Sequence, residues 1–133
     1  VEGMRCLDGG CSCPIPVKWA LARGFEKIVI VTTRHKSFRK EPTSRRMVDL
    51  YGDVYANHTR FYASLLTMDV RYNALMDEMD ELEAAGRALI LRPSEPIAID
   101  RFEGNTDKLL DLVNLGRRDA ETNLAAIKEY LGK

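Results

Sequence analysis

Two short runs of β-branched and aliphatic residues indicate that the chain forms strands. Residues 27–33 read KIVIVTT, and residues 88–91 read ALIL. Neither run alternates apolar with polar residues. A strand without polar alternation is typical of a parallel sheet that helices cover on both faces. We therefore expect buried strands of the parallel type at both places, the second one stopped by Pro93 and Pro96.

The first 34 residues predict a strand, a turn, a helix and a second strand. Met4 to Leu7 is a short apolar run, and Asp8-Gly9-Gly10 stops it. Two adjacent glycines allow backbone angles that are closed to other residues, so we expect a tight turn with the aspartate at its tip. Residues 17–23 are good helix formers. With the run at 27–33, this order makes a βαβ unit over residues 1–34.

Residues 35–86 are expected to form a basic loop followed by helices. We expect the loop to end in a helix start near residues 43–44, and residues 47–85 to form two helices with a break near residues 68–69. The second helix carries one apolar stripe at spacings of three and four. The stripe consists of Tyr72, Leu75, Met76, Met79 and Leu82.

Residues 87–133 are expected to contain the second strand and two C-terminal helices separated by Gly116. Strands of the parallel type that alternate with helices place the chain in the α/β class. So few strands would leave sheet edges exposed. We therefore expect residues 1–133 to be the C-terminal part of a domain whose remaining sheet lies on the N-terminal side.

The charge and composition exclude some classes of function. Twenty basic residues balance twenty acidic ones, which gives no reason to expect a nucleic-acid partner. No apolar run approaches the roughly 20 residues that span a bilayer. The first five residues lack the apolar core of a signal peptide and do not begin with Met, so we take residue 1 as an interior position or a processing boundary.

The strongest candidate for chemistry is Asp8. A carboxylate at the end of a strand of an α/β sheet, beside two glycines that permit close approach, can orient or deprotonate a nucleophile. Asp8-Gly9-Gly10 can equally be a turn with no chemical role. Composition and spacing leave both interpretations open.

Three clustered cysteines are a second candidate. The three cysteines are Cys6, Cys11 and Cys13. An odd count without a secretory signal argues against a disulfide framework and suits a reducing cytoplasm. Their spacing is not a familiar zinc pattern, and a fourth ligand would have to come from His35 or His58. Free cysteines in a turn are the simpler interpretation, and we expect no metal and no organic cofactor.

The order of these segments resembles the patatin-like phospholipase family, most closely its bacterial esterase branch. The segments that carry the resemblance are Met4 to Gly10, Pro14-Ile15-Pro16-Val17, Ala20 to Gly24, the strand at residues 28–31, Thr33-Arg34 and Arg92 to Pro96. It covers essentially the whole chain. One position departs from the pattern, because Cys13 stands where the family usually has an aspartate before Pro-Ile-Pro.

The resemblance implies a partial three-layer α/β/α patatin-like fold and a serine esterase or lipid acyl hydrolase. Asp8 would be the aspartate of a Ser–Asp dyad, with Gly9, Gly10 and Arg34 near the substrate. The serines of this chain lack the Gly-x-Ser-x-Gly flanks of the family's nucleophile. The serine would therefore come from an N-terminal part of the same protein, and the isolated chain would be inactive.

Other interpretations of the remaining residues stay open. The basic loop of residues 34–46 could contact anionic lipid at a membrane surface, although a solvated loop is the simpler interpretation. The aromatic and methionine side chains could line an acyl-chain pocket instead of a core. The chain could also be a non-catalytic interaction module whose helices 47–85 bind a partner. Mutation of Asp8 discriminates, because in such a module it matters only to the turn.

Overall fold

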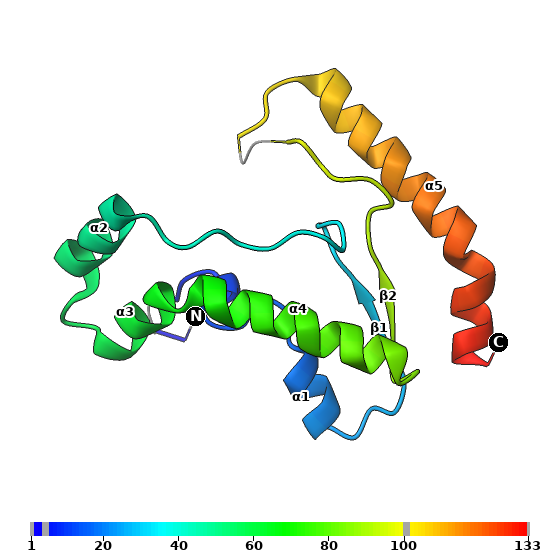
Figure 1. Ribbon diagram of the computed structural model, residues 1–133, viewed down its shortest axis with the longest axis horizontal. Coiled ribbons are helices and arrows are strands. Elements are labelled where there is room, and N and C mark those ends of the chain that lie inside the picture. The colour runs from blue at the N-terminus through cyan, green and yellow to red at the C-terminus, as the bar shows by residue number, and fades with distance from the viewer. Residues whose placement is uncertain (1, 4–5, 100–101, 133) are drawn as a thin grey trace. The chain divides into compact units, whose positions relative to one another are not determined.

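The computed structural model describes residues 2–3, 6–99 and 102–132. The chain forms two compact units, each described here by itself: unit 1 comprises residues 1–23 and 39–79, and unit 2 comprises residues 24–38 and 80–133. Figure 1 shows the helices and strands of both units. In chain order they are η1 (Gly9–Cys11), α1 (Val17–Ala22), β1 (Ile28–Val31), α2 (Arg45–Tyr55), α3 (Thr59–Leu66), α4 (Met68–Ala84), β2 (Ala88–Leu91) and α5 (Thr106–Leu131).

The sheet of unit 2 confirms the prediction of parallel apolar strands. Strands β1 and β2 lie side by side (Figure 1) and pair in parallel, with Ile28 opposite Ala88 and Val31 opposite Leu91. The burial expected on both faces is only partly seen: Ile30, Ala88 and Ile90 are buried, whereas the other residues of the two strands are half-buried or, at Val31, exposed. The strand predicted at 27–33 is shorter at both ends. The described residues are helix-rich with a small two-stranded parallel sheet, which is compatible with a partial α/β fold.

The described sheet has two strands, and part of it stays open to solvent. Val31, the last residue of β1, keeps 73% of its surface exposed. The strand predicted at Met4 to Leu7 is not formed by the two of its residues that the structure describes. Cys6 and Leu7 adopt no regular structure, and Met4 and Arg5 lie outside the described residues. A strand requires a neighbour for its backbone N–H and C=O groups, and the described residues supply none at this position.

Helix α5 shows that one sequence prediction was wrong. We expected Gly116 to separate two helices, but residues 106–131 form a single helix. A glycine inside a helix costs about 1 kcal/mol relative to alanine but does not remove a backbone hydrogen bond. The real ends are Asn105, whose side chain accepts from the N–H groups of Asp107 and Lys108, and Gly132, which adopts φ = 72°. Among the described residues no helix, α5 included, is long and apolar enough to cross a membrane.

A tyrosine near the end of α5 holds this helix to the sheet of unit 2. The Tyr130 hydroxyl accepts from the backbone N–H of Ile28 at 3.0 Å and donates to the carbonyl of Arg87 at 2.7 Å. Ile28 is the first residue of β1 and Arg87 directly precedes β2, so one side chain links three elements. The middle of α5 is anchored by Leu115, which is buried.

Residues 45–84 form three helices where we predicted two. The start near residue 44 is confirmed, since the Ser44 side chain accepts from the N–H of Met47 and caps α2. The break near residues 68–69 is also confirmed, because α3 ends at Leu66 and α4 begins at Met68. A second break at residues 56–58 was missed.

The missed break follows from the residues at the end of α2. His58 N–H donates to the Tyr55 carbonyl at 2.8 Å in a tight turn, which Asn57 favours because its side chain competes for backbone groups. The ring of Phe61 packs edge-on against that of Tyr55, with centroids 4.9 Å apart.

The stripe predicted on α4 is confirmed as packing: Tyr72 and Met79 are buried.

Candidate functional site

Asp8 lies at the tip of a tight turn in unit 1. Its Oδ1 accepts a hydrogen bond from the N–H of Gly10 at 2.7 Å, so the aspartate caps the short helix η1. The backbone N–H of Cys11 donates to the Asp8 carbonyl, and that of Cys13 donates to the Gly9 carbonyl. Asp8 itself is exposed, and its Oδ2 accepts no hydrogen bond within the described chain. The turn thus presents a carboxylate with one oxygen held and the other open.

The two glycines serve the turn differently from the sequence prediction. We expected them to supply unusual backbone angles, but among the described glycines positive φ occurs at Gly3, Gly24, Gly86 and Gly132. Gly10 allows a close approach instead, since a Cβ there would lie 3.1 Å from Asp8 Oδ1, tighter than ordinary van der Waals contact. A Cβ at Gly9 would meet nothing within 4 Å. Only Gly10 is therefore tied to the position of the carboxylate.

Two side chains that sequence reasoning missed fasten this turn to the helices of unit 1. Arg71 on α4 donates from Nη1 to the Ser12 carbonyl at 2.7 Å and from Nη2 to the Cys11 carbonyl at 3.1 Å. The Ser64 hydroxyl on α3 donates to the same Cys11 carbonyl at 2.9 Å. No local signal could have revealed these contacts, because they join residues more than 50 positions apart.

A cavity of about 320 Å³ in unit 1 adjoins the turn. Lys18 and Glu78 both line this cavity and form an ion pair at 3.2 Å. Cys13 also lines it, and all three cysteines are free of disulfide bonds. Within the described residues no group of three or more potential metal ligands is close enough to hold an ion.

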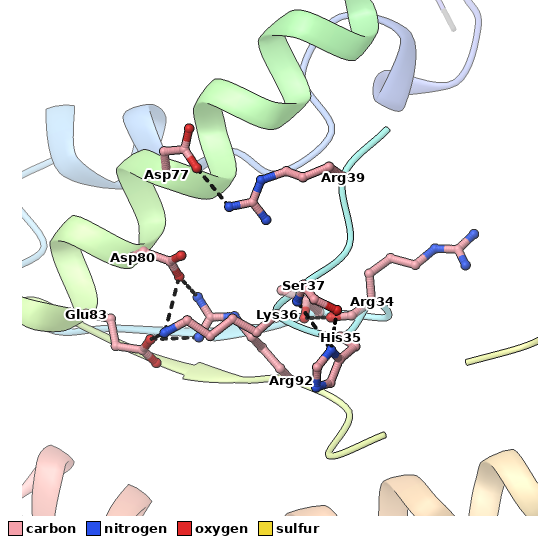
Figure 2. A network of polar contacts seen from close by, with 10 residues as sticks. Arg34, His35, Lys36, Ser37, Arg39, Asp77, Asp80, Glu83 and Arg92 are labelled. Carbon is pink, nitrogen blue, oxygen red and sulfur yellow. Dashed lines mark hydrogen bonds and ion pairs between the residues drawn. The ribbon is translucent and has the colours of Figure 1, made fainter. Parts of the chain in front are cut away.

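Arg34, the fourth residue of the predicted site, belongs to unit 2. It follows β1 and holds its guanidinium over the ring of Phe38, 4.7 Å from the centroid. It lines a largely apolar cavity of about 410 Å³ between the carboxyl ends of β1 and β2 and helix α5. Ligands in α/β proteins bind at the carboxyl ends of the strands. In Figure 2 the Arg34 side chain points away from the neighbouring ionic cluster.

That cluster is built around Arg92, which follows β2. Its guanidinium pairs with Asp80 and, at 2.7 Å, with Glu83, both on α4, while Lys36 lies 3.6 Å from Glu83 (Figure 2). The Arg92 side chain is 12% exposed, so its charge would be costly without partners. The cluster joins the loop after β2 to the end of α4.

The basic loop before α2 is also held by contacts. Arg39 pairs with Asp77 at 2.8 Å, and Lys40 lies over the Tyr72 ring, 4.8 Å from its centroid (Figure 2 shows the Arg39 pair). The Lys40 backbone exchanges two hydrogen bonds with the Asn73 side chain. Both basic side chains therefore have protein partners within unit 1.

Asp119 on α5 lines the larger cavity, and its neighbours there stabilise the ionised form of its carboxyl group. The Ser94 side chain and backbone N–H donate to it, and Arg118 adds positive charge, so the pKa of Asp119 lies below its usual value of 3.8. A lowered pKa means that folding favours the charged form. Its stabilising effect is complete well above pH 3.8 and is lost as the pH falls through the lower folded-state value.

Asp119→Asn should therefore lower the free energy of unfolding by about 0.5 kcal/mol at neutral pH, as expected for a partly exposed charge. The difference from the unmodified protein should shrink as the pH falls through the lowered pKa of Asp119, because protonation removes the same charge that the substitution removes. Urea unfolding from neutral to acidic pH measures it, with Asp111→Asn on the same helix as the matched control. A difference that persists undiminished at low pH would show that charge is not the cause.

Comparison with curated proteins and with solved structures found no match. A family model described as a domain of unknown function (DUF6363) matches residues 58–132. The match spans α3, α4, β2 and α5 and includes Ser64 and Arg71, while the Asp8 turn precedes it. Because it covers more than half of the 133 residues, the chain belongs to the DUF6363 family, a domain family of unknown function.

Proposed function

We propose that this chain is the C-terminal part of a patatin-like serine esterase, in which Asp8 is the carboxylate of a Ser–Asp dyad. The observation that carries the proposal is the Asp8 turn itself. Its carboxylate is exposed, Oδ1 is held by the Gly10 N–H at 2.7 Å, and Oδ2 is open to a partner. A fixed carboxylate with one open oxygen is what a serine hydroxyl needs from its orienting base.

In this proposal the serine comes from an N-terminal part of the same protein. Its hydroxyl would give its proton to Asp8 Oδ2 as the oxygen attacks the carbonyl carbon of a carboxylic ester. The leaving alkoxide takes this proton from Asp8 and departs as the alcohol, and an acyl-enzyme remains. Water then attacks the acyl carbon and gives a proton to Asp8, which returns it to the serine oxygen as the free acid is released. The substrate class is a lipid or other carboxylic ester, and no cofactor is required. The cysteines, which form no disulfide, suit a cytoplasmic protein.

The fold proposed for the whole domain is a three-layer α/β/α sandwich of the patatin type. The open side of the described sheet supports it, because Val31 of β1 is an apolar strand residue with 73% of its surface exposed. A parallel sheet normally has helices on both faces and further strands at its edges. The N-terminal part of the protein would supply those strands and the serine together.

The isolated 133-residue chain should not hydrolyse esters. A short-chain p-nitrophenyl ester, followed by absorbance, should show no turnover above the buffer rate for this chain and clear turnover for the longer protein. The reason is that neither the serine nor its oxyanion donors are contributed by residues 1–133. Turnover by the isolated chain that is lost in Asp8→Asn would mean that the nucleophile lies within this chain.

A second candidate function is a non-catalytic interaction module. Leu50 and Val54 on α2 favour it, since they stand one helical turn apart and keep 49% and 56% of their surfaces exposed. Neighbouring apolar residues on an exposed helix face are typical of partner surfaces. Only the esterase requires the charge of Asp8, so ester hydrolysis by Asp8→Asn separates the two candidates.

A further inference from the structure

We infer that Arg71 is a positioning residue, which holds the Asp8 turn by capping the carbonyl ends of two elements with one guanidinium. The inference deepens the proposed function and rests on it, because the turn is the proposed site. Arg71 lies on α4, 63 positions after Asp8 along the chain, and both residues belong to unit 1.

The first element that Arg71 caps is the short helix η1. The last carbonyls of any helix lack N–H donors within it. At the end of η1 these are the Cys11 and Ser12 carbonyls, and the Arg71 guanidinium donates to both, at 3.1 Å and 2.7 Å. The Ser64 hydroxyl adds a second donor to the Cys11 carbonyl at 2.9 Å.

The second element is the C-terminal end of α3. Arg71 Nη2 donates to the Ser64 carbonyl at 2.7 Å and to the Ser64 hydroxyl at 2.8 Å, and Nε donates to the Thr67 hydroxyl at 3.2 Å. Ser64 Oγ therefore accepts from Arg71 while it donates to Cys11. The turn, the end of α3 and the start of α4 meet at one cationic group.

This arrangement requires an arginine. The planar guanidinium presents five N–H donors in a fixed fork, whereas the lysine ammonium is a point charge with three donors on a flexible stem. The acceptors here lie on two different elements and face both Nη atoms and Nε. A lysine could keep the charge but could not reach all of them in this geometry.

The capped carbonyls are linked to the carboxylate through a few hydrogen bonds. The N–H of Cys11, whose carbonyl Arg71 holds, donates to the Asp8 carbonyl at 3.1 Å. The next amide toward Asp8, that of Gly10, donates to Oδ1. A shift of η1 would therefore move the Asp8 carboxyl relative to a serine hydroxyl. Misplacement of a reacting group by about 1 Å can lower a rate by about 10²-fold.

The test compares Arg71→Lys with the unmodified longer protein. We expect kcat for ester hydrolysis to fall roughly 10- to 100-fold, with KM changed less than about threefold, because the geometry of the base changes and substrate contacts do not. Hydrogen exchange of the amides of residues 10–13 should become at least about tenfold faster, since the turn loses its anchor. Arg60→Lys, an exposed arginine of α3, is the matched control and should change neither quantity.

The possible results separate this inference from the proposed function. A kcat within about twofold of the unmodified protein, or unchanged exchange at residues 10–13, overturns the role of Arg71. Equal loss of kcat and exchange protection throughout unit 1 also overturns it, since that result describes general unfolding. Full activity in Asp8→Asn refutes the esterase proposal itself, while the exchange measurement still decides whether Arg71 holds the turn.

Discussion

Asp8→Asn should reduce ester hydrolysis by the longer protein about 10³- to 10⁴-fold, because the same change at the aspartate of a catalytic triad lowers kcat about 10⁴-fold. The amide cannot accept the serine proton or balance the charge that develops during attack. The fold should be unaffected, because asparagine caps helices as well as aspartate does. The asparagine side-chain oxygen can still accept the hydrogen bond that the Gly10 N–H donates to Asp8 Oδ1 at 2.7 Å in the unmodified protein. Initial rates and thermal unfolding of the same preparations measure both effects.

Asp53→Asn is the control for this prediction. Asp53 is an exposed aspartate on α2, and loss of its charge should leave kcat and the unfolding temperature unchanged. If Asp8→Asn keeps its activity within a few-fold, the turn has no catalytic role. The interaction-module interpretation would then be favoured.

Arg92→Ala should lower the free energy of unfolding by roughly 2–3 kcal/mol, which is the largest effect on stability that we predict. Removal of one partner from a buried ion pair costs about 3–5 kcal/mol, because the remaining charge is desolvated and has no partner. Here the carboxylates of Asp80 and Glu83 are 30% and 32% exposed and Lys36 stays close to both. Partial hydration and the remaining cation place the expected loss below that range.

Arg45→Ala provides the matched comparison. Arg45 pairs with Asp49 at 3.1 Å one turn along α2, and the two side chains are 88% and 57% exposed. A helical surface pair of this kind contributes about 0.5 kcal/mol or less. Urea unfolding of both variants should therefore separate them clearly. If Arg92→Ala lowers the free energy of unfolding as little as Arg45→Ala does, the Arg92 cluster does not stabilise unit 2.

The parts of the fold that could be predicted from the sequence are those set by local signals. The run IVIV at residues 28–31 and the run ALIL at residues 88–91 predict strands of the parallel type, and they pair in parallel. The side chain of Ser44 marks a helix start through its own hydrogen bond. The stripe on α4 shows its buried side through spacing alone, as the burial of Met79 confirms.

Predictions failed where a local preference was weak or where its outcome depended on distant residues. Gly116 lowers helix propensity but cannot end a helix whose neighbours pack, and the burial of Leu115 beside it decides the outcome. The run at Cys6 and Leu7 has strand-like composition. However, strand formation depends on a backbone partner that composition cannot specify.

In the candidate site, too, local features could be predicted from the sequence and long-range contacts could not. The turn at Asp8 could be predicted, because Asp-Gly-Gly has the local chemistry of a turn. The reason for Gly10 could not, since it is the 3.1 Å approach to Asp8 Oδ1 and not an unusual backbone angle. The role of Arg71 depends on contacts with Cys11 and Ser12 across some 60 residues, which no spacing pattern contains.

The most direct test of the central claim is covalent labelling of the longer protein with a serine-reactive fluorophosphonate, followed by mass spectrometry of the labelled peptide. We predict one labelled serine outside residues 1–133, with a labelling rate that falls about 10²-fold or more in Asp8→Asn because the hydroxyl loses its base. Labelling at the unmodified rate in Asp8→Asn, or labelling of a serine within residues 1–133, would contradict the assignment of Asp8 as the partner of an external nucleophile.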